Sequence, residues 1–419
     1  MMQGRFQVSG MGPMATVLER HREFQPPRAL RVRSFRYHSL DALRGTMMLL
    51  GIYLHAGVAF SSRGSWPWKD GSTTVVFDLS LGLIHVFRMP VFYVMAGFFA
   101  ALLLEQRGQA DFLRNRVVRI LLPFAAGWAV LFPLVAALVT AATNLEEPWT
   151  IPVKYLQFFS SGEVWRHVDP MHLWFLEYLL IFYAIALAVI PLARRRPTLV
   201  AKVERTFRAV LISPLGPLIL AAITFPVLCF MEEGGLDDPS GFVPEWKIVI
   251  TYLVFFASGW LLYRNADLLP TLRRLPRLPI VLVLGLAAAL LGFYCLWRLA
   301  QSTASHPHLW FLGSAWFLGL SMWLFIFGFT GLFLRYLERP VPWIRYLSDS
   351  SYWLYLMHMP VILVFQIAVA GTGWTPAVKA LVVLAASAPT LLASYHVLVR
   401  STWVGAILNG RRYPVRWRP

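Results

Sequence analysis

An arginine and a histidine in the first apolar segment are spaced so that one extended ligand could contact both. Arg44 and His55 are 11 residues apart in SLDALRGTMMLLGIYLHAGVAF. On a helix they share one face, about 20° out of line and roughly 16 Å apart along the axis. Asp41 precedes Arg44 by three residues, a spacing that allows an ion pair. The arginine could bind an anionic group, and the imidazole could accept a proton. The structural alternative is an arginine that snorkels to the membrane surface and a histidine that only packs.

Further ionisable or polar residues stand inside apolar segments, where their cost in lipid makes each a functional candidate. They are His85 and Arg88 in LIHVFRMPVFYVMAGFF, His172 and Glu177 in DPMHLWFLEYLLIFY, and Tyr355 and His358, which form one stripe with Ser351 in SDSSYWLYLMHMPV. His172 and Glu177 are about 500° apart on a helix and do not form a dyad. Structural alternatives remain: Arg88 could pair with Glu177 to hold two helices together, and the Tyr355 stripe could join helices by hydrogen bonds.

Motifs for metals and nucleotides are absent. The chain has no P-loop, no dinucleotide fingerprint, no GxSxG and no HExxH. His306 and His308 lack carboxylate or thiol partners at metal spacing and suggest a solvated loop, while Cys229 and Cys295 form no CxxC pair. We therefore predict neither a metal site nor a permanently bound cofactor.

The composition indicates which elements must position these residues. Of 419 residues, 58% are hydrophobic and only 14% are charged, which excludes a soluble enzyme. A bilayer core requires roughly 20 apolar residues per helix. Ten segments qualify, at about 40–61, 76–104, 118–142, 171–193, 209–231, 246–263, 279–300, 309–335, 351–371 and 376–399. We predict an all-α, polytopic transmembrane bundle of about ten spans.

The charge pattern predicts the orientation of this bundle. The formal net charge is +17, and arginines and lysines gather in the two tails and in every second connection. Such a bias marks the cytoplasmic side, so both termini are expected there and nucleic acid is not an expected partner. We predict basic cytoplasmic tails at 1–39 and 401–419 around a transmembrane domain at 40–400.

These motifs, in this order, resemble the acyltransferase family 3 membrane proteins over about 38–400. The family signature is a basic residue and a histidine with ten residues between them, here Arg44 and His55. FRMPVFYVMAGF resembles its second-span arginine motif, and RNRVVRILLPF contains its R-x-x-R as Arg116 and Arg119. HLWFLEYLL and SYWLYLMHMPV resemble its fourth-span and C-terminal motifs. The fourth span contains Trp174-Phe-Leu-Glu177 instead of the longer polar form of many acetylating members, which leaves the role of Glu177 open.

The resemblance implies an enzyme of the bacterial inner membrane that moves an acyl group from cytoplasmic acyl-CoA to a hydroxyl of a periplasmic glycan. The length and the HLWFL segment are most similar to a subgroup associated with succinylation of periplasmic glucans, so succinyl-CoA is the expected donor, with acetyl transfer as the alternative. The donor would be bound by four arginines: Arg44, Arg114, Arg116 and Arg119. His55 would be the general base or would carry the acyl group, and both mechanisms stay open.

Other side chains are expected to assist. Arg88 and the Tyr355 and His358 stripe are candidates to stabilise the oxyanion. Asp41, His85, His172 and Glu177 are expected as supporting polar residues. The acceptor would enter past the connection 143–170, whose aromatic residues suit stacking on sugar rings: Trp149, Tyr155 and Trp165.

Two other classes of protein fit the same residues. A proton-coupled transporter would use intramembrane His, Arg and Glu as a relay, but such transporters usually have repeated halves, and no internal repeat is evident. A membrane scaffold would tolerate substitution of Arg44, His55 and Arg88.

Overall fold

The computed structural model describes residues 37–64, 66–232, 235–239, 241–273, 278–301 and 305–414. The chain divides into two units, Met1–Tyr37 and His38–Pro419, and the second is described below. Residues 1–36 of the predicted N-terminal tail lie outside the described residues, as do Arg274, Arg277, Arg416 and Arg418.

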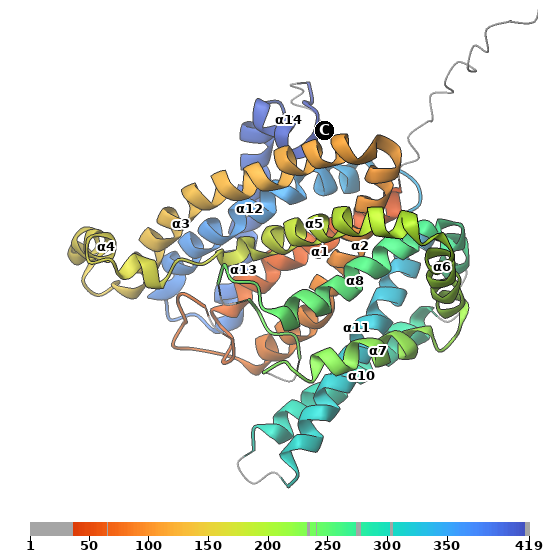
Figure 1. Ribbon diagram of the computed structural model, residues 1–419. Helices are drawn as coiled ribbons and strands as arrows, with labels where there is room; N and C mark the ends of the chain where they lie inside the picture. Colours follow the sequence, from red (N-terminus) through yellow and green to blue (C-terminus); the bar gives the residue numbers. More distant parts are fainter. Residues whose placement is uncertain are drawn as a thin grey trace, which may run out of the picture. The chain divides into compact units, whose positions relative to one another are not determined.

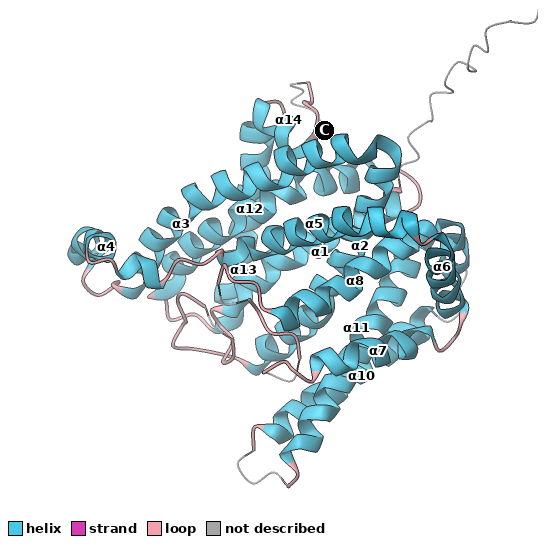
Figure 2. Cartoon of the chain, viewed as in Figure 1, coloured by secondary structure: helices cyan, strands magenta, loops and turns pink. Residues whose placement is uncertain are grey.

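The described residues form helices and no strand (Figures 1 and 2). The all-α prediction is therefore confirmed. The long helices are α1 (His38–Val58), α2 (Val75–Arg116), α3 (Leu122–Thr143), α5 (Trp174–Arg195), α8 (Trp246–Arg264), α10 (Leu278–Leu299), α11 (Pro307–Tyr336), α12 (Pro342–Ala370) and α13 (Pro376–Ser394). The shorter ones include α4 (Ile151–Ser160), α6 (Pro197–Ile212), α7 (Gly216–Leu228), α9 (Leu269–Arg273) and α14 (Trp403–Asn409).

Seven helical stretches of the described residues are long and apolar enough to cross a membrane. One of them, Val75–Thr143, runs through α2 and α3 and includes Gly108, whose φ of 75° breaks α2 near its end. The chain is thus a helical membrane protein. The total of about ten spans and the cytoplasmic position of both termini stay predictions.

The segment predicted as a span at 209–231 is divided in the structure. α6 ends at Ile212 and α7 covers only 13 residues, which is about 20 Å of helix against a core of about 30 Å. Pro214 and Pro217 explain the break, because proline lacks the amide hydrogen that a continuous helix requires. α6 itself carries polar and apolar residues on different faces, and no separate helix was expected there.

Close backbone contact fixes α2 against α8. A Cβ atom on Gly97 would lie 1.9 Å from the carbonyl oxygen of Phe256, and one on Gly259 would lie 1.9 Å from that of Val94. Only glycine permits such an approach, which is a common way for membrane helices to associate. α2 also packs against α1, which contacts α11, α12 and α13 as well. This packing places the polar faces of α1, α2 and α12 together.

The bundle has a basic end and a cavity end, which are distinguished by the α1 residues nearest to them. The basic end contains Arg44, and the cavity end contains His55 and the described residues of the connections 59–74, 144–170 and 229–245. The first of these connections is tied to α13 by a buried ion pair between Asp70 and Lys379, 2.7 Å long. That tether helps to place Trp66, in the same connection, beside α1.

Candidate active site

One face of α1 carries three positions that matter for the site: Arg44, Gly51 and His55. They are separated by seven and four residues, so they follow one line along the helix. A Cβ atom on Gly51 would lie 2.5 Å from Nη1 of Arg88 on α2. The guanidinium of Arg88 therefore lies against the α1 backbone, one turn from His55 toward the basic end.

Three imidazole rings form a chain at the centre of the bundle. The centroids of His55 and His358 are 4.9 Å apart, and those of His358 and His172 are also 4.9 Å apart. Trp66 also stacks on His55, with ring centroids 5.0 Å apart. Residues from α1, α12 and the 3₁₀ turn Met171–Leu173 just before α5 thus meet, although they are far apart in the sequence.

Backbone carbonyls fix two of these rings. His172 Nε2 lies 3.0 Å from the carbonyl oxygen of Leu356, and His358 Nδ1 lies 2.6 Å from that of Tyr355. The hydroxyl of Tyr355 donates to the carbonyl oxygen of His172 over 2.7 Å. Within the described part of the chain, three ring nitrogens are buried without a hydrogen-bond partner: His55 Nδ1, His172 Nδ1 and His358 Nε2.

Gln366 holds His55 from α12, a role that our sequence analysis missed. Its amide nitrogen donates to the carbonyl oxygen of His55 over 3.0 Å, and its amide oxygen accepts from the Trp66 indole over 2.9 Å. Gln366 is fully buried. A polar residue inside the apolar run VILVFQIAVA was a usable signal for Gln366, whereas no sequence pattern pointed to Trp66.

A cavity of about 1770 Å³ opens onto His55 at the cavity end. His172, Trp66 and Trp174 also line it, together with many carboxylates: Asp78, Glu163, Asp169, Glu232, Asp237, Asp238 and Glu245. Aromatic faces and hydrogen-bond acceptors of this kind suit a ligand rich in hydroxyl groups. Of the aromatic residues expected to stack on sugars, Trp149 and Trp165 are strongly exposed, while the Tyr155 hydroxyl donates to the carbonyl oxygen of Pro133 over 3.4 Å.

His85 and Glu177 stand at the margins of this arrangement. His85 lines the cavity, with Nε2 3.3 Å from the carbonyl oxygen of Leu236. Among the described residues no ion pair joins Arg88 to Glu177, and Glu177 Oε2 is buried without a partner. The helix-pairing alternative for Arg88 and Glu177 is therefore wrong in this structure. Nor do three or more His, Cys, Asp or Glu side chains gather as a metal site in the described part of the chain.

The four arginines expected to bind the donor lie at the basic end, each in a different environment. Arg44 pairs with Asp41 over 3.4 Å, as their spacing predicted. Arg116 lies over the ring of Tyr183, 4.5 Å from its centroid, and Arg114 is exposed. Arg119 donates to the carbonyl oxygen of Leu408 over 2.7 Å, so this arginine also holds α14.

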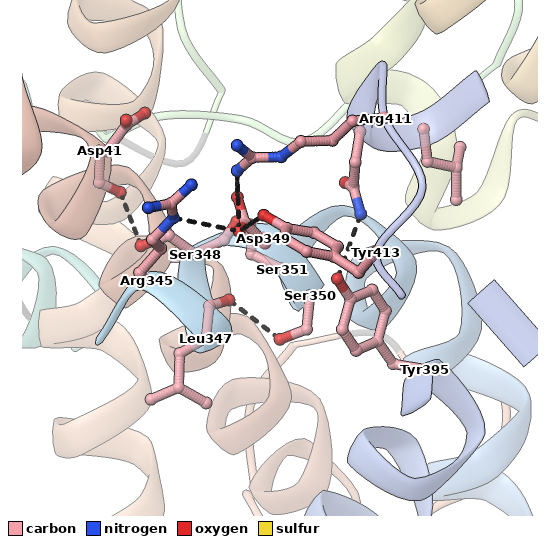
Figure 3. Close-up of polar contacts among 12 residues, drawn as sticks. Asp41, Arg345, Leu347, Ser348, Asp349, Ser350, Ser351, Tyr395, Arg411 and Tyr413 are labelled. Atoms are coloured by element: carbon pink, nitrogen blue, oxygen red, sulfur yellow. Dashed lines mark hydrogen bonds and ion pairs between the residues drawn. The ribbon is translucent and has the colours of Figure 1, made fainter. Parts of the chain in front are cut away.

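The segment after α13 packs onto the basic end of the bundle (Figure 3). Asp349 on α12 accepts hydrogen bonds from Arg411, at 3.0 and 3.1 Å, and from the hydroxyl of Tyr413. Burial, with the Asp349 hydrogen bond, raises the pKa of Tyr413, so its hydroxyl keeps the proton that it donates. Residues 403–414, expected as part of a tail, thus include a helix and a fixed contact to α12.

The chain is similar to known proteins over most of its length. Residues 37–399 match the family model described as Acyltransferase domain. Glucans biosynthesis protein C of Escherichia coli strain K12 is 24% identical over 346 residues, covering 79% of this chain and 83% of that protein. The proteins of that name from E. coli O6:K15:H31 and O9:H4 show the same identity. No solved structure matches the chain.

The matched residues include all of α1, with Arg44 and His55, and continue to the end of the helical turn that follows α13. The resemblance stated from the sequence motifs is therefore confirmed. Since the match extends over most of the chain and the structure is a bundle of apolar helices, the protein belongs to acyltransferase family 3 and is a membrane acyltransferase.

Proposed function

We propose that the protein transfers an acyl group, succinyl in our proposal, from cytoplasmic acyl-CoA to a hydroxyl of a periplasmic glucan in the bacterial inner membrane. One observation carries the proposal: His55 faces the large cavity on one side, while its own helix leads past Arg88 to the arginines of the basic end. A donor and an acceptor that approach from opposite ends would meet at His55.

The basic end suits the donor. Coenzyme A carries phosphates on one end of a long pantetheine arm, and arginine side chains bind phosphates with planar, permanently charged forks. Arg116 stands at this end, and Arg44 begins the line of α1 residues that ends at His55. The arm would follow that line for roughly 16 Å and bring the thioester to the imidazole.

The cavity suits the acceptor. Its volume of about 1770 Å³ exceeds the roughly 300–1,000 Å³ of sites for drug-sized ligands, which leaves room for an oligosaccharide. Carboxylates in the lining accept hydrogen bonds from sugar hydroxyls.

The reaction replaces the thioester sulfur on the acyl carbon by the oxygen of the acceptor hydroxyl, and a proton is transferred with this exchange. His55 takes the proton from the acceptor hydroxyl while the hydroxyl oxygen bonds to the thioester carbon. The carbon–sulfur bond then breaks, and the leaving thiolate receives the proton back from His55. Attack on an acyl group first carried by His55 would use the same geometry.

Arg88 is the group best placed for the oxyanion in this proposal. Its guanidinium lies one turn from His55 toward the donor. The hydroxyl proton of Tyr355 is engaged by the carbonyl of His172, and Nδ1 of His358 by that of Tyr355. Neither therefore offers a donor to the oxyanion here, and the oxyanion role first expected of both falls to Arg88.

Mass spectrometry of envelope glucans tests the proposal. Glucans would be compared from a strain without the gene, the same strain with the wild-type gene, and the same strain with His55→Gln. We expect a mass increase of succinyl groups only with the wild-type gene. An increase of acetyl groups instead would correct the donor, and identical glucans in all three strains would refute the proposed acceptor.

A further inference from the structure

The buried side of the His55 ring faces an imidazole whose hydrogen-bonding state is fixed. Nδ1 of His358 lies 2.6 Å from the carbonyl oxygen of Tyr355. Because a carbonyl oxygen can only accept, Nδ1 carries the hydrogen, and Nε2 of the neutral ring is left as a bare acceptor. That Nε2 is buried, and no described residue provides it with a hydrogen.

The hydrogen-bond donors of His172 and Tyr355 are engaged elsewhere. Nε2 of His172 donates to the carbonyl oxygen of Leu356, so Nδ1 of His172 is a second bare acceptor and cannot donate to His358. The Tyr355 hydroxyl donates to the backbone of His172. Two buried nitrogens near His358 remain without a partner among the residues described, Nδ1 of His55 and Nε of Arg88. Of the two, the His55 ring is the one in ring contact with His358.

We propose that His358 is a positioning residue whose Nε2 accepts a hydrogen bond from the Nδ1–H group of His55. This inference rests on the proposed function, in which His55 is the base. The two ring centroids are 4.9 Å apart and the ring planes differ by 40°. A direct bond requires the rings to rotate until the two nitrogens are about 3 Å apart, and one bridging water would serve instead. With its hydrogen held on Nδ1, His55 presents an unprotonated Nε2 toward the cavity.

The consequence for catalysis follows the logic of a base oriented by a third group. The hydrogen bond selects the tautomer of His55 that can accept the proton of the acceptor hydroxyl. It also stabilises the imidazolium that forms when that proton arrives. No atom passes to His358, whose own hydrogen stays on Nδ1, bonded to the carbonyl oxygen of Tyr355.

Two isosteric substitutions distinguish this role from packing. The amide nitrogen of Asn in His358→Asn can replace Nδ1 but leaves nothing at the Nε2 position, whereas the amide oxygen of Gln in His358→Gln can replace the acceptor. Both would be assayed in proteoliposomes with succinyl-CoA and a purified neutral glucan. We expect His358→Asn to lower kcat by about 10²-fold with an unchanged KM for succinyl-CoA, and His358→Gln to recover at least about tenfold of that loss.

The outcomes separate the inference from the proposed function. Transfer by neither wild type nor any variant would refute the function itself. Transfer by wild type and full loss with His55→Gln, together with wild-type turnover of His358→Asn, would refute only the positioning role. Equal losses in His358→Asn and His358→Gln would make His358 a packing residue.

A measurement without substitution at His358 covers the case in which its variants do not fold. Two-bond ¹⁵N–¹H couplings in ¹⁵N-histidine-labelled wild-type protein report which ring nitrogen of each of the ten histidines is protonated. His55 would be assigned by comparison with His55→Gln. Protonation of His55 at Nδ1 is the expected result, and protonation at Nε2 would overturn the proposal.

Discussion

His55 acts as a base only if one ring nitrogen is free of hydrogen and faces the acceptor. The ring lines the cavity, and Gln366 holds its backbone carbonyl from α12. We predict that His55→Gln, which keeps a polar side chain but loses the proton acceptor, lowers transfer by 10²–10⁴-fold or more. Binding of acyl-CoA, measured by isothermal titration calorimetry, should stay near wild type because the basic end is unchanged. Near wild-type turnover of correctly inserted His55→Gln would instead place the base at His85, His172 or His358.

Gly51 tests the placement of Arg88 without changing that arginine. A Cβ atom in Gly51→Ala would lie 2.5 Å from Nη1 of Arg88, so the guanidinium must move away from α1. Loss of one oxyanion donor costs about 10²–10³ in kcat, and we expect a decrease of at least about tenfold from this displacement. Gly371→Ala is the matched control, because nothing lies within 4 Å of its new Cβ. Equal kcat for both variants would remove Arg88 from the mechanism.

At the scale of elements, α12 connects the two ends of the bundle. It carries Asp349 at the basic end, His358 at the centre and Gln366 toward the cavity. Since Asp349 binds Arg411 and Tyr413, the segment 403–414 is a part of the basic end. Arg119 holds the same segment through Leu408, so the donor arginines and the C-terminal contact depend on each other.

We predict that Asp349→Asn releases this segment. Hydrogen bonds to a charged group contribute about 1.5–3 kcal/mol, so trypsin should cut after Arg411 and Arg412 at least about tenfold faster in detergent. KM for acyl-CoA should rise as Arg119 loses its support. Asp267→Asn removes an exposed ion pair with Arg208 and should change neither value. An unchanged cleavage rate in Asp349→Asn would show that other contacts hold the segment.

At the scale of the whole molecule, the proposed reaction requires the basic end to face the cytoplasm. Single cysteines at Trp165, strongly exposed at the cavity end, and at exposed Arg412 test this after Cys229 and Cys295 are replaced by Ala. A membrane-impermeant maleimide should label Trp165→Cys in intact spheroplasts and Arg412→Cys only after permeabilisation. The reverse pattern would place the donor arginines on the wrong side and overturn the predicted orientation.

Local patterns in the sequence were enough for the class of protein. Long apolar runs exclude a soluble fold and indicate a chain that lies in lipid. In lipid only helices or closed barrels satisfy the hydrogen bonds of the backbone, and the structure is helical and apolar as expected. The spacing of Arg44 and His55 determines their shared face, and the spacing of Asp41 and Arg44 their ion pair. The order of the motifs identified the family, which the match over residues 37–399 confirms.

Contacts between distant segments were decided only by the tertiary structure. The neighbours of His55 come from residues 66, 358 and 366, and no periodicity in one segment says which segment will pack beside it. The division of 209–231 was missed because apolar content hid the effect of two prolines. The docking of residues 403–414 was missed because they contact Asp349, which is distant in the sequence. The roles of the site residues stay predictions. Hydropathy and helical spacing act within a segment, whereas the site exists only where several segments meet.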